Sequence, residues 1–195
     1  MRVRQAFYLA GVILGNRMVE IVQLADLREQ HAVRAGFAAW RKRFHEDYGL
    51  RTRITDLSNL TLCCLAEPGE DSDALLNSLI TGFLGYDERN VFGELAPADQ
   101  TRIIDIHLFL ADQIRFELMH RMGWIETGSD FYPLAEIVRD FARIRTHFAA
   151  AFPRLAQSHP AYGEYIRLIH RDQQVLIRRL LPSALEAFKE SYLQM

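Results

Sequence analysis

The chain has 195 residues, of which 49% are hydrophobic and 25% charged, and its formal net charge is −2. These proportions are ordinary for a globular protein and exclude a disordered or collagen-like chain. With 23 Lys and Arg against 25 Asp and Glu, the chain lacks the basic excess of a phosphate-binding domain, so nucleic acid is not an expected partner.

The N-terminal quarter of the chain has a helical pattern. Apolar residues recur every three or four positions over residues 3–48, which predicts one long helix or two. Residues 6–14 follow two arginines, as in a secretory signal, but no small-residue cleavage pattern comes after them and the run is too short to span a bilayer. We interpret the run as a buried helix segment of a cytoplasmic protein. The G-x-x-x-G pattern of Gly11 and Gly15 begins within this run and permits another helix to approach closely.

An aromatic stripe with a basic flank lies at the end of this region. Phe37, Trp40 and Phe44 recur at helical spacing, and Arg41 and Arg43 lie beside them. Such a helix can dock in a groove of another protein, lie on an anionic membrane or touch nucleic acid. The same pattern arises when a helix buries its aromatic side in its own core, which is the commoner case in globular chains. Among the functional alternatives, we favour a protein partner bound by these five residues.

Capping residues divide the next part of the chain. Asp56 or Ser58 predicts the start of a short helix through residues 63–66. Ser and Asp at positions 72 and 73 then predict a helix over residues 74–84, which Gly85 ends.

Residues 85–96 predict an ordered loop, after which Pro97 predicts the start of a helix over residues 97–122 that Gly123 caps. Apolar side chains occupy nearly every face of this helix, which is typical of a helix surrounded by others. We therefore expect it to be the central element of the fold.

Two long helices are predicted to complete the chain. An apolar stripe over residues 134–152 predicts the first, which Pro153 ends or bends. Pro160 predicts the start of the second, which Pro182 kinks or divides. The sequence thus predicts an all-α fold, a compact bundle of five to seven helices around the helix at residues 97–122, in a single domain.

The sharpest local pattern for metal binding is Glu117 followed three residues later by His120. Di-metal bundles use this spacing twice, together with two further Glu, whereas it occurs once here. A metal site would need another ligand, such as His170 on the last helix. The alternative, which we favour, is that Glu117 pairs with Arg121 four residues on, while the helix dipole stabilises His120 at the helix end.

Other catalytic patterns are missing from the sequence. It has no G-x-S-x-G elbow, no P-loop and no G-x-G-x-x-G, and we expect no cofactor. The adjacent Cys63 and Cys64 match neither a redox pair nor a zinc knuckle, so we expect two reduced, mostly buried thiols.

The sequence therefore favours a non-enzymatic protein-interaction module, such as an adaptor, assembly factor or chaperone, because amphipathic helix surface is abundant while catalytic patterns are missing. We expect a homodimer with residues 3–48 at its interface. The alternative is a helical-bundle enzyme or ligand-binding protein with a site between helices, with or without a metal, that uses Glu117, His120 and His170.

Overall fold

The computed structural model describes residues 24–86, 92–127, 132–150 and 152–192. These residues are predominantly helical, which confirms the predicted class, with ten α-helices rather than the expected five to seven. The helices are α1 (Leu24–Gly36), α2 (Ala38–Phe44), α3 (Asn59–Ala66), α4 (Glu70–Leu84), α5 (Pro97–Arg121), α6 (Leu134–Arg139), α7 (Phe141–Ala150), α8 (Tyr162–Tyr165), α9 (His170–Arg179) and α10 (Leu181–Tyr192), with the 3₁₀ turns η1 (Ile54–Asp56) and η2 (Phe92–Glu94) and the strands β1 (Ile125–Glu126) and β2 (Arg154–Leu155).

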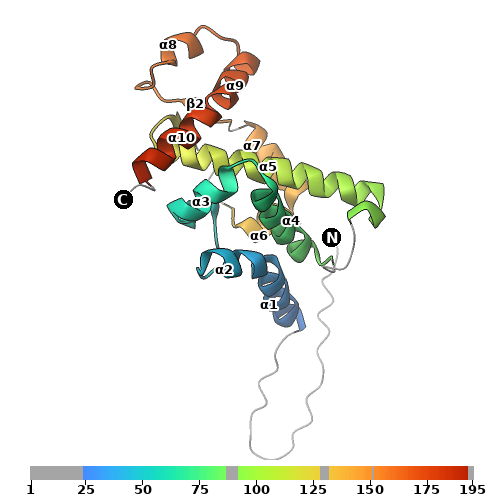
Figure 1. The fold of residues 1–195 in the computed structure, drawn as a ribbon. Coiled ribbons are helices and arrows are strands. Elements are labelled where there is room, and N and C mark those ends of the chain that lie inside the picture. The colour runs from blue at the N-terminus through green and yellow to red at the C-terminus, as the bar shows by residue number, and fades with distance from the viewer. Residues whose placement is uncertain (1–23, 87–91, 128–131, 151, 193–195) are drawn as a thin grey trace, which may run out of the picture.

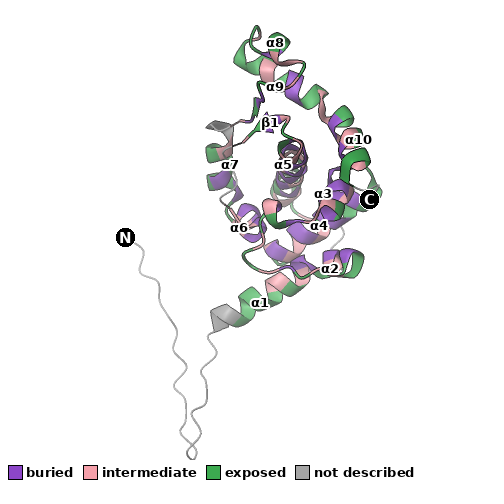
Figure 2. Cartoon of the chain, turned by 90° about the vertical axis from the view of Figure 1, so that its left-hand side faces the viewer, coloured by how far each residue is buried: buried purple, intermediate pink, exposed green. Residues whose placement is uncertain are grey.

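The long helix α5 is the central element, as predicted. It crosses the middle of the molecule in Figure 1, with α1 and α2 on one side and α8 and α9 on the other. Figure 2 looks nearly along α5 and shows α3, α4, α6, α7 and α10 arranged around it. The enclosure is incomplete, however, because Ile104 is 47% exposed and Leu108 is 61% exposed. The expectation of a helix covered on every face is therefore wrong for the N-terminal half of α5.

Local chemistry places several helix ends where the sequence predicts them. The Ser58 hydroxyl accepts a hydrogen bond of 3.1 Å from the Thr61 amide at the start of α3. Gly85 follows α4 with a φ of 79° and Gly123 follows α5 with a φ of 69°, a conformation that glycine adopts without a steric penalty. Helix α4 begins at Glu70, earlier than predicted. Acidic residues fill its first turn, where their negative charges interact favourably with the positive end of the helix dipole.

The closest helix approach joins α1 to α4. A Cβ atom added to Gly82 would lie 2.5 Å from the backbone nitrogen of Gly36 and 2.6 Å from its Cα atom. A Cβ atom added to Gly36 would lie 2.7 Å from the ring of Phe83. The two glycines thus allow the two backbones to touch, a role that the sequence suggested for Gly11 and Gly15, which lie outside the described residues.

A carboxylate bound by three hydroxyl groups ties the segment after α2 to α3. The carboxylate of Glu46 accepts hydrogen bonds from Ser58 at 2.6 Å, from Tyr48 at 2.8 Å and from Thr61 at 3.2 Å. Burial raises the pKa of the Tyr48 hydroxyl well above its ordinary value, so this group remains a hydrogen-bond donor. The cluster holds the chain in the turn that leads from the aromatic core to α3.

The C-terminal third departs most from the prediction. The expected helix over residues 134–152 is broken at Asp140, which separates α6 from α7. The helix expected from Pro160 is divided twice: the break between α9 and α10 lies beside Pro182, as predicted, whereas the break between α8 and α9 was not predicted. Pro182 lies in the first turn of α10, where its missing N–H removes no helical hydrogen bond. Strands β1 and β2 form a short antiparallel pair that the sequence did not predict.

His159, in the turn after β2, makes the stability of this region dependent on pH. Its ring centroid lies 4.8 Å from that of Trp124, and its Nδ1 accepts a hydrogen bond of 3.1 Å from the Ala161 amide. Burial lowers the pKa of His159 from its ordinary value of 6.5. The folded state favours the neutral ring of His159. The free energy of unfolding is therefore highest above the pKa that His159 has in the unfolded chain, and it falls as the pH drops from there through the lower pKa of His159 in the folded chain.

We therefore expect His159→Asn, which keeps an acceptor at the Nδ1 position but does not titrate, to reduce the loss of stability below about pH 6.5. Urea unfolding of both proteins at a series of pH values measures the difference. Parallel stability curves for the wild type and the variant would contradict the assignment.

Candidate functional site

Glu117 and His120 lie together near the end of α5, as the sequence predicts. The Nδ1 atom of His120 is 3.7 Å from Oε2 of Glu117. The Glu117 side chain is nearly buried, whereas His120 is exposed. The other carboxylate oxygen, Oε1, accepts a hydrogen bond of 2.8 Å from Nε of Arg121. The favoured ion pair between residues 117 and 121 is therefore present.

Arg121 uses the rest of its guanidinium to join α5 to the start of α3 and to η1. It donates to Oδ1 of Asn59 at 2.8 Å and to the carbonyl oxygen of Thr55 at 2.9 Å. All three donor nitrogens are thus occupied, and one of them neutralises a carboxylate that lies almost entirely inside the fold. The arrangement is that of a structural ion pair.

His170 does not join this pair. It is exposed at the start of α9, where its Nε2 atom lies 3.2 Å from Nε2 of Gln174. Within the described ranges, no group of three or more His, Cys, Asp or Glu side chains is placed to hold a metal ion. The predicted set of Glu117, His120 and His170 is therefore corrected to an ion pair of Glu117 with Arg121, with His120 beside it.

The aromatic stripe is part of the hydrophobic core. Phe37 and Trp40 have no exposed surface, and Phe44 is 9% exposed. The rings of Phe37 and Trp40 meet edge to face at 5.6 Å, and the indole N–H of Trp40 donates to the carbonyl oxygen of Leu75 at 2.9 Å. These three residues contact other parts of their own chain, which confirms the commoner alternative, a helix that buries its aromatic side in its own core, and leaves Phe37 and Trp40 no exposed surface for a partner.

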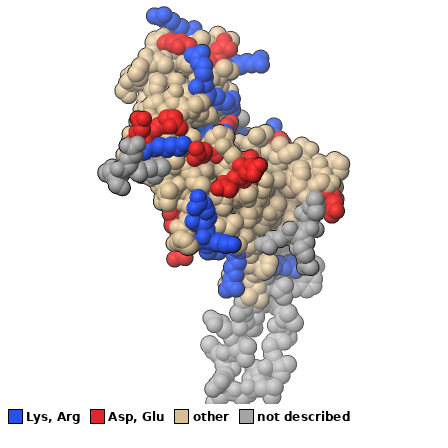
Figure 3. Space-filling model, viewed as in Figure 1, with Lys and Arg blue, Asp and Glu red and all other residues tan. Residues whose placement is uncertain are grey.

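The two arginines of the stripe differ in their surroundings. The guanidinium of Arg41 donates to the carbonyl oxygens of Val33 and Tyr48, and its central carbon lies 5.9 Å from the centroid of the Phe37 ring. Arg41 therefore holds the end of α2 in place, while Arg43 is exposed. Figure 3 shows Lys and Arg side chains over α2 with acidic side chains of α4 close by on the same face.

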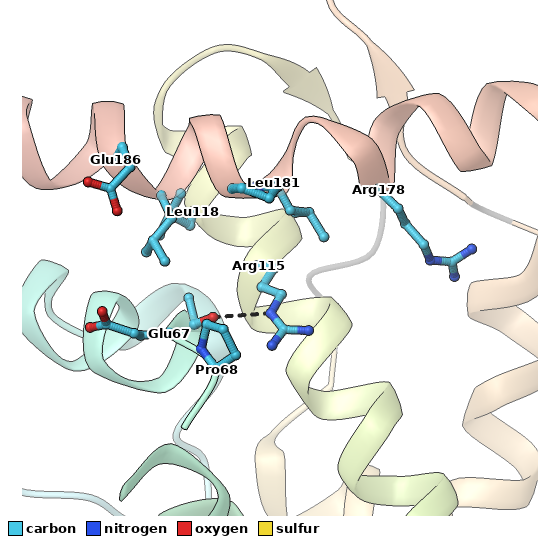
Figure 4. A pocket seen from close by; sticks show the side chains of 10 residues that line it. Glu67, Pro68, Arg115, Leu118, Arg178, Leu181 and Glu186 are labelled. Carbon is cyan, nitrogen blue, oxygen red and sulfur yellow. Dashed lines mark hydrogen bonds between the residues drawn. The ribbon is translucent and has the colours of Figure 1, made fainter. Parts of the chain in front are cut away.

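A cleft of about 520 Å³ lies between the end of α3, the C-terminal third of α5 and the junction of α9 with α10 (Figure 4). Residues far apart in the sequence form it, and no motif in the sequence indicates it. Its apolar lining consists of Ala66, Pro68, Leu118, Leu181, Pro182 and Leu185, and its charged lining of Glu67, Arg115, Arg178 and Glu186.

Three of the four charged residues in the cleft have an ionic partner. Lys189 lies 2.9 Å from Glu67 and 3.3 Å from Glu186, and Asp112 lies 3.0 Å from Arg178. Arg115 differs: its Nε donates to the carbonyl oxygen of Ala66 at 3.1 Å, and no carboxylate among the described residues pairs with it. The cleft thus contains a half-buried guanidinium whose positive charge no described carboxylate neutralises.

A second candidate surface lies on the N-terminal half of α5. Ile104 and Leu108 lie one helical turn apart and form an exposed apolar ridge, here called the α5 ridge. A groove of about 360 Å³ borders it on the side of α4 and η2, where Phe92 is 44% exposed. Another groove of about 360 Å³ borders Leu108 on the side of α7, with Phe109 and Phe141 in its wall.

Comparison with known proteins supplies no family for the chain, because no family model, curated protein or solved structure matches it. Among the described helices, none combines the length and apolarity needed to cross a membrane.

Cys63 is buried and Cys64 half-buried, both as free thiols, and burial raises the pKa of both above the ordinary value. Both thiols are therefore poor nucleophiles at neutral pH.

Proposed function

We propose that the chain is a non-enzymatic protein-interaction module that forms a homodimer through the α5 ridge. The observation that carries the proposal is the 61% exposure of Leu108 on a helix that buries Ile103, Ile106 and Leu110 on another face. Ile104 and Phe92 extend the exposed apolar surface on the same side. Contiguous apolar surface of this kind marks a site of association in soluble proteins.

The shape of this region favours a second copy of the chain as the partner. A ridge flanked by two grooves is complementary to itself, because in a twofold pair each ridge can enter a groove of the other copy. Polar pairs border the apolar surface: Arg145 lies 3.6 Å from Asp105, and His107 lies 3.1 Å from Asp73. An apolar centre with a polar rim is the usual anatomy of a protein interface.

The described part of the N-terminal region offers less apolar surface. On the outer face of α1, Leu27 is the large hydrophobic residue that is exposed, at 52%, and residues 28–31 are polar and exposed. The proposed interface therefore moves from residues 3–48 to α5. Residues 3–23 of the earlier interface prediction lie outside the described ranges.

The test compares two exposed leucines, one on each candidate interface. Each protein is measured by size-exclusion chromatography with light scattering at tens of micromolar. We expect Leu108→Asp to weaken the dimer by at least about 100-fold, because each dimer loses two buried leucines and gains two buried charges. Leu27→Asp, the matched control, is expected to leave the dimer unchanged.

A dimer that resists Leu108→Asp but dissociates in Leu27→Asp would place the interface on the N-terminal helix and overturn the proposal. Circular dichroism of both variants shows whether each remains folded. Because both leucines are mostly exposed, neither change is expected to disturb the core.

A cytoplasmic location belongs to the same proposal. Small secreted domains typically have a disulfide framework, whereas both cysteines of this chain are free. Free thiols with a raised pKa persist best in a reducing compartment.

A further inference from the structure

We propose that the cleft between α3, α5 and α10 binds a small amphipathic carboxylate, an organic acid with an aliphatic tail, whose head group pairs with Arg115. This site is separate from the α5 ridge and does not depend on dimer formation. Three features of the cleft support it: its size, the apolar character of its walls and a cation, Arg115, that pairs with no carboxylate in the described ranges.

The size and the walls fit an aliphatic chain. The volume of about 520 Å³ lies within the range of about 300 to 1,000 Å³ that small-molecule sites occupy. Leucine, proline and alanine side chains from α3, α5 and α10 and from the residues next to them form the walls, and Figure 4 shows Leu118 and Leu181 on one side of the space and Pro68 on the other. An aliphatic tail placed there removes apolar surface from water on several sides.

The charges select an anionic head group. Glu67 and Glu186 are both within ion-pair distance of Lys189, and the charge of Arg178 is balanced by an aspartate. Arg115 therefore remains as the group whose pairing with a ligand costs the protein no existing salt bridge. A cationic head group would meet repulsion from Arg115, and both carboxylates of the cleft already lie within ion-pair distance of Lys189.

The orientation of Arg115 suits a carboxylate in particular. The hydrogen bond from its Nε to the Ala66 carbonyl fixes the plane of the guanidinium (Figure 4). The two terminal nitrogens donate no hydrogen bond to another described residue, and they are spaced to meet both oxygens of a carboxylate. A guanidinium already held in position loses less conformational freedom when the ligand binds.

Isothermal titration with three probes of equal chain length tests the proposal: decanoate, decanol and decyltrimethylammonium. We expect saturable binding of one decanoate per chain, weaker binding of decanol and no binding of the cation. Arg115→Met, which keeps an unbranched apolar stem but removes the guanidinium and its charge, should weaken decanoate binding by about 10- to 100-fold. Arg143→Met, which removes an exposed arginine outside the cleft, is the matched control and should bind decanoate like the wild type.

A second variant allows the proposal to be tested if Arg115→Met fails to fold. Leu185→Trp fills the cleft from α10 without touching Arg115's bond to α3 and is also expected to abolish decanoate binding. Equal binding of decanoate and decyltrimethylammonium, equal affinity in Arg115→Met, or no decanoate binding to the wild type would each overturn the proposal. Decanoate binding by the Leu108→Asp protein separates this outcome from that of the dimer.

Discussion

Replacing Gly82 with alanine is expected to lower the free energy of unfolding by about 3 kcal/mol, because overpacking of a tight contact forces the backbone to move. The new methyl group would lie 2.5 Å from a backbone atom of Gly36, and no side-chain rotation relieves such a clash. Helix α1 must therefore withdraw from α4, and the edge-to-face contact of Phe37 with Phe83 at 5.3 Å weakens with it. Urea unfolding followed by circular dichroism measures the loss.

Gly163→Ala is the control for this change. A Cβ atom at Gly163, within α8, meets nothing within 4 Å. Alanine is favoured over glycine in a helix by up to about 1 kcal/mol, so this variant should be as stable as the wild type or slightly more stable. Equal stabilities for the two alanine variants would show that α1 and α4 do not meet at these glycines.

Arg121→Met is expected to cost about 3 kcal/mol or more, because it leaves a buried carboxylate without its cation. Glu117 is 9% exposed and its Oε1 atom is bonded to this arginine. The hydrogen bonds to Asn59 and Thr55 are lost in the same change. The measurement is again the free energy of unfolding in urea.

The double variant Glu117→Leu with Arg121→Met identifies the cause of the loss. Replacing both members of a buried pair by apolar residues is often close to neutral, so the double variant should recover much of the stability that Arg121→Met loses. Arg143→Met, at an exposed pair in which Arg143 lies 2.7 Å from Glu136, should show no measurable loss. If Glu117→Leu fails to rescue Arg121→Met, the buried charge is not the reason for the instability.

Features that depend on neighbouring residues could be predicted from the sequence. The cap at Ser58, the glycine stops at Gly85 and Gly123 and the start at Pro97 each depend on chemistry within a few residues. The ion pair of Glu117 with Arg121 belongs to the same group, since both residues lie on one helix.

Features that depend on tertiary contacts could not be predicted. The apolar stripe continues across Asp140 with no Gly or Pro to mark the break between α6 and α7. Strands of two residues are too short to show an alternating pattern, so β1 and β2 left no signal. The C-terminal third was therefore predicted as two long helices, the second divided at Pro182 as observed, although it also contains breaks that the sequence did not predict.

The candidate sites contain both kinds of feature, those that the sequence predicts and those that depend on tertiary contacts. Spacing predicted that Phe37 and Trp40 share a helix face, but only the packing of α2 against α4 shows that this face is internal. Because α5 is apolar on nearly every side, its sequence could not indicate that Leu108 remains exposed. The position of Arg115 in a cleft depends on α3 and α10, which lie far from it along the chain.

The most direct test of self-association through the α5 ridge is sedimentation equilibrium. The wild type and Leu108→Asp are compared over a concentration series that reaches tens of micromolar. We predict a mass that rises from monomer to dimer with concentration in the wild type and stays at that of the monomer in the variant. A wild-type chain that remains monomeric throughout the series, or a Leu108→Asp protein that dimerises equally well, would contradict the proposed function.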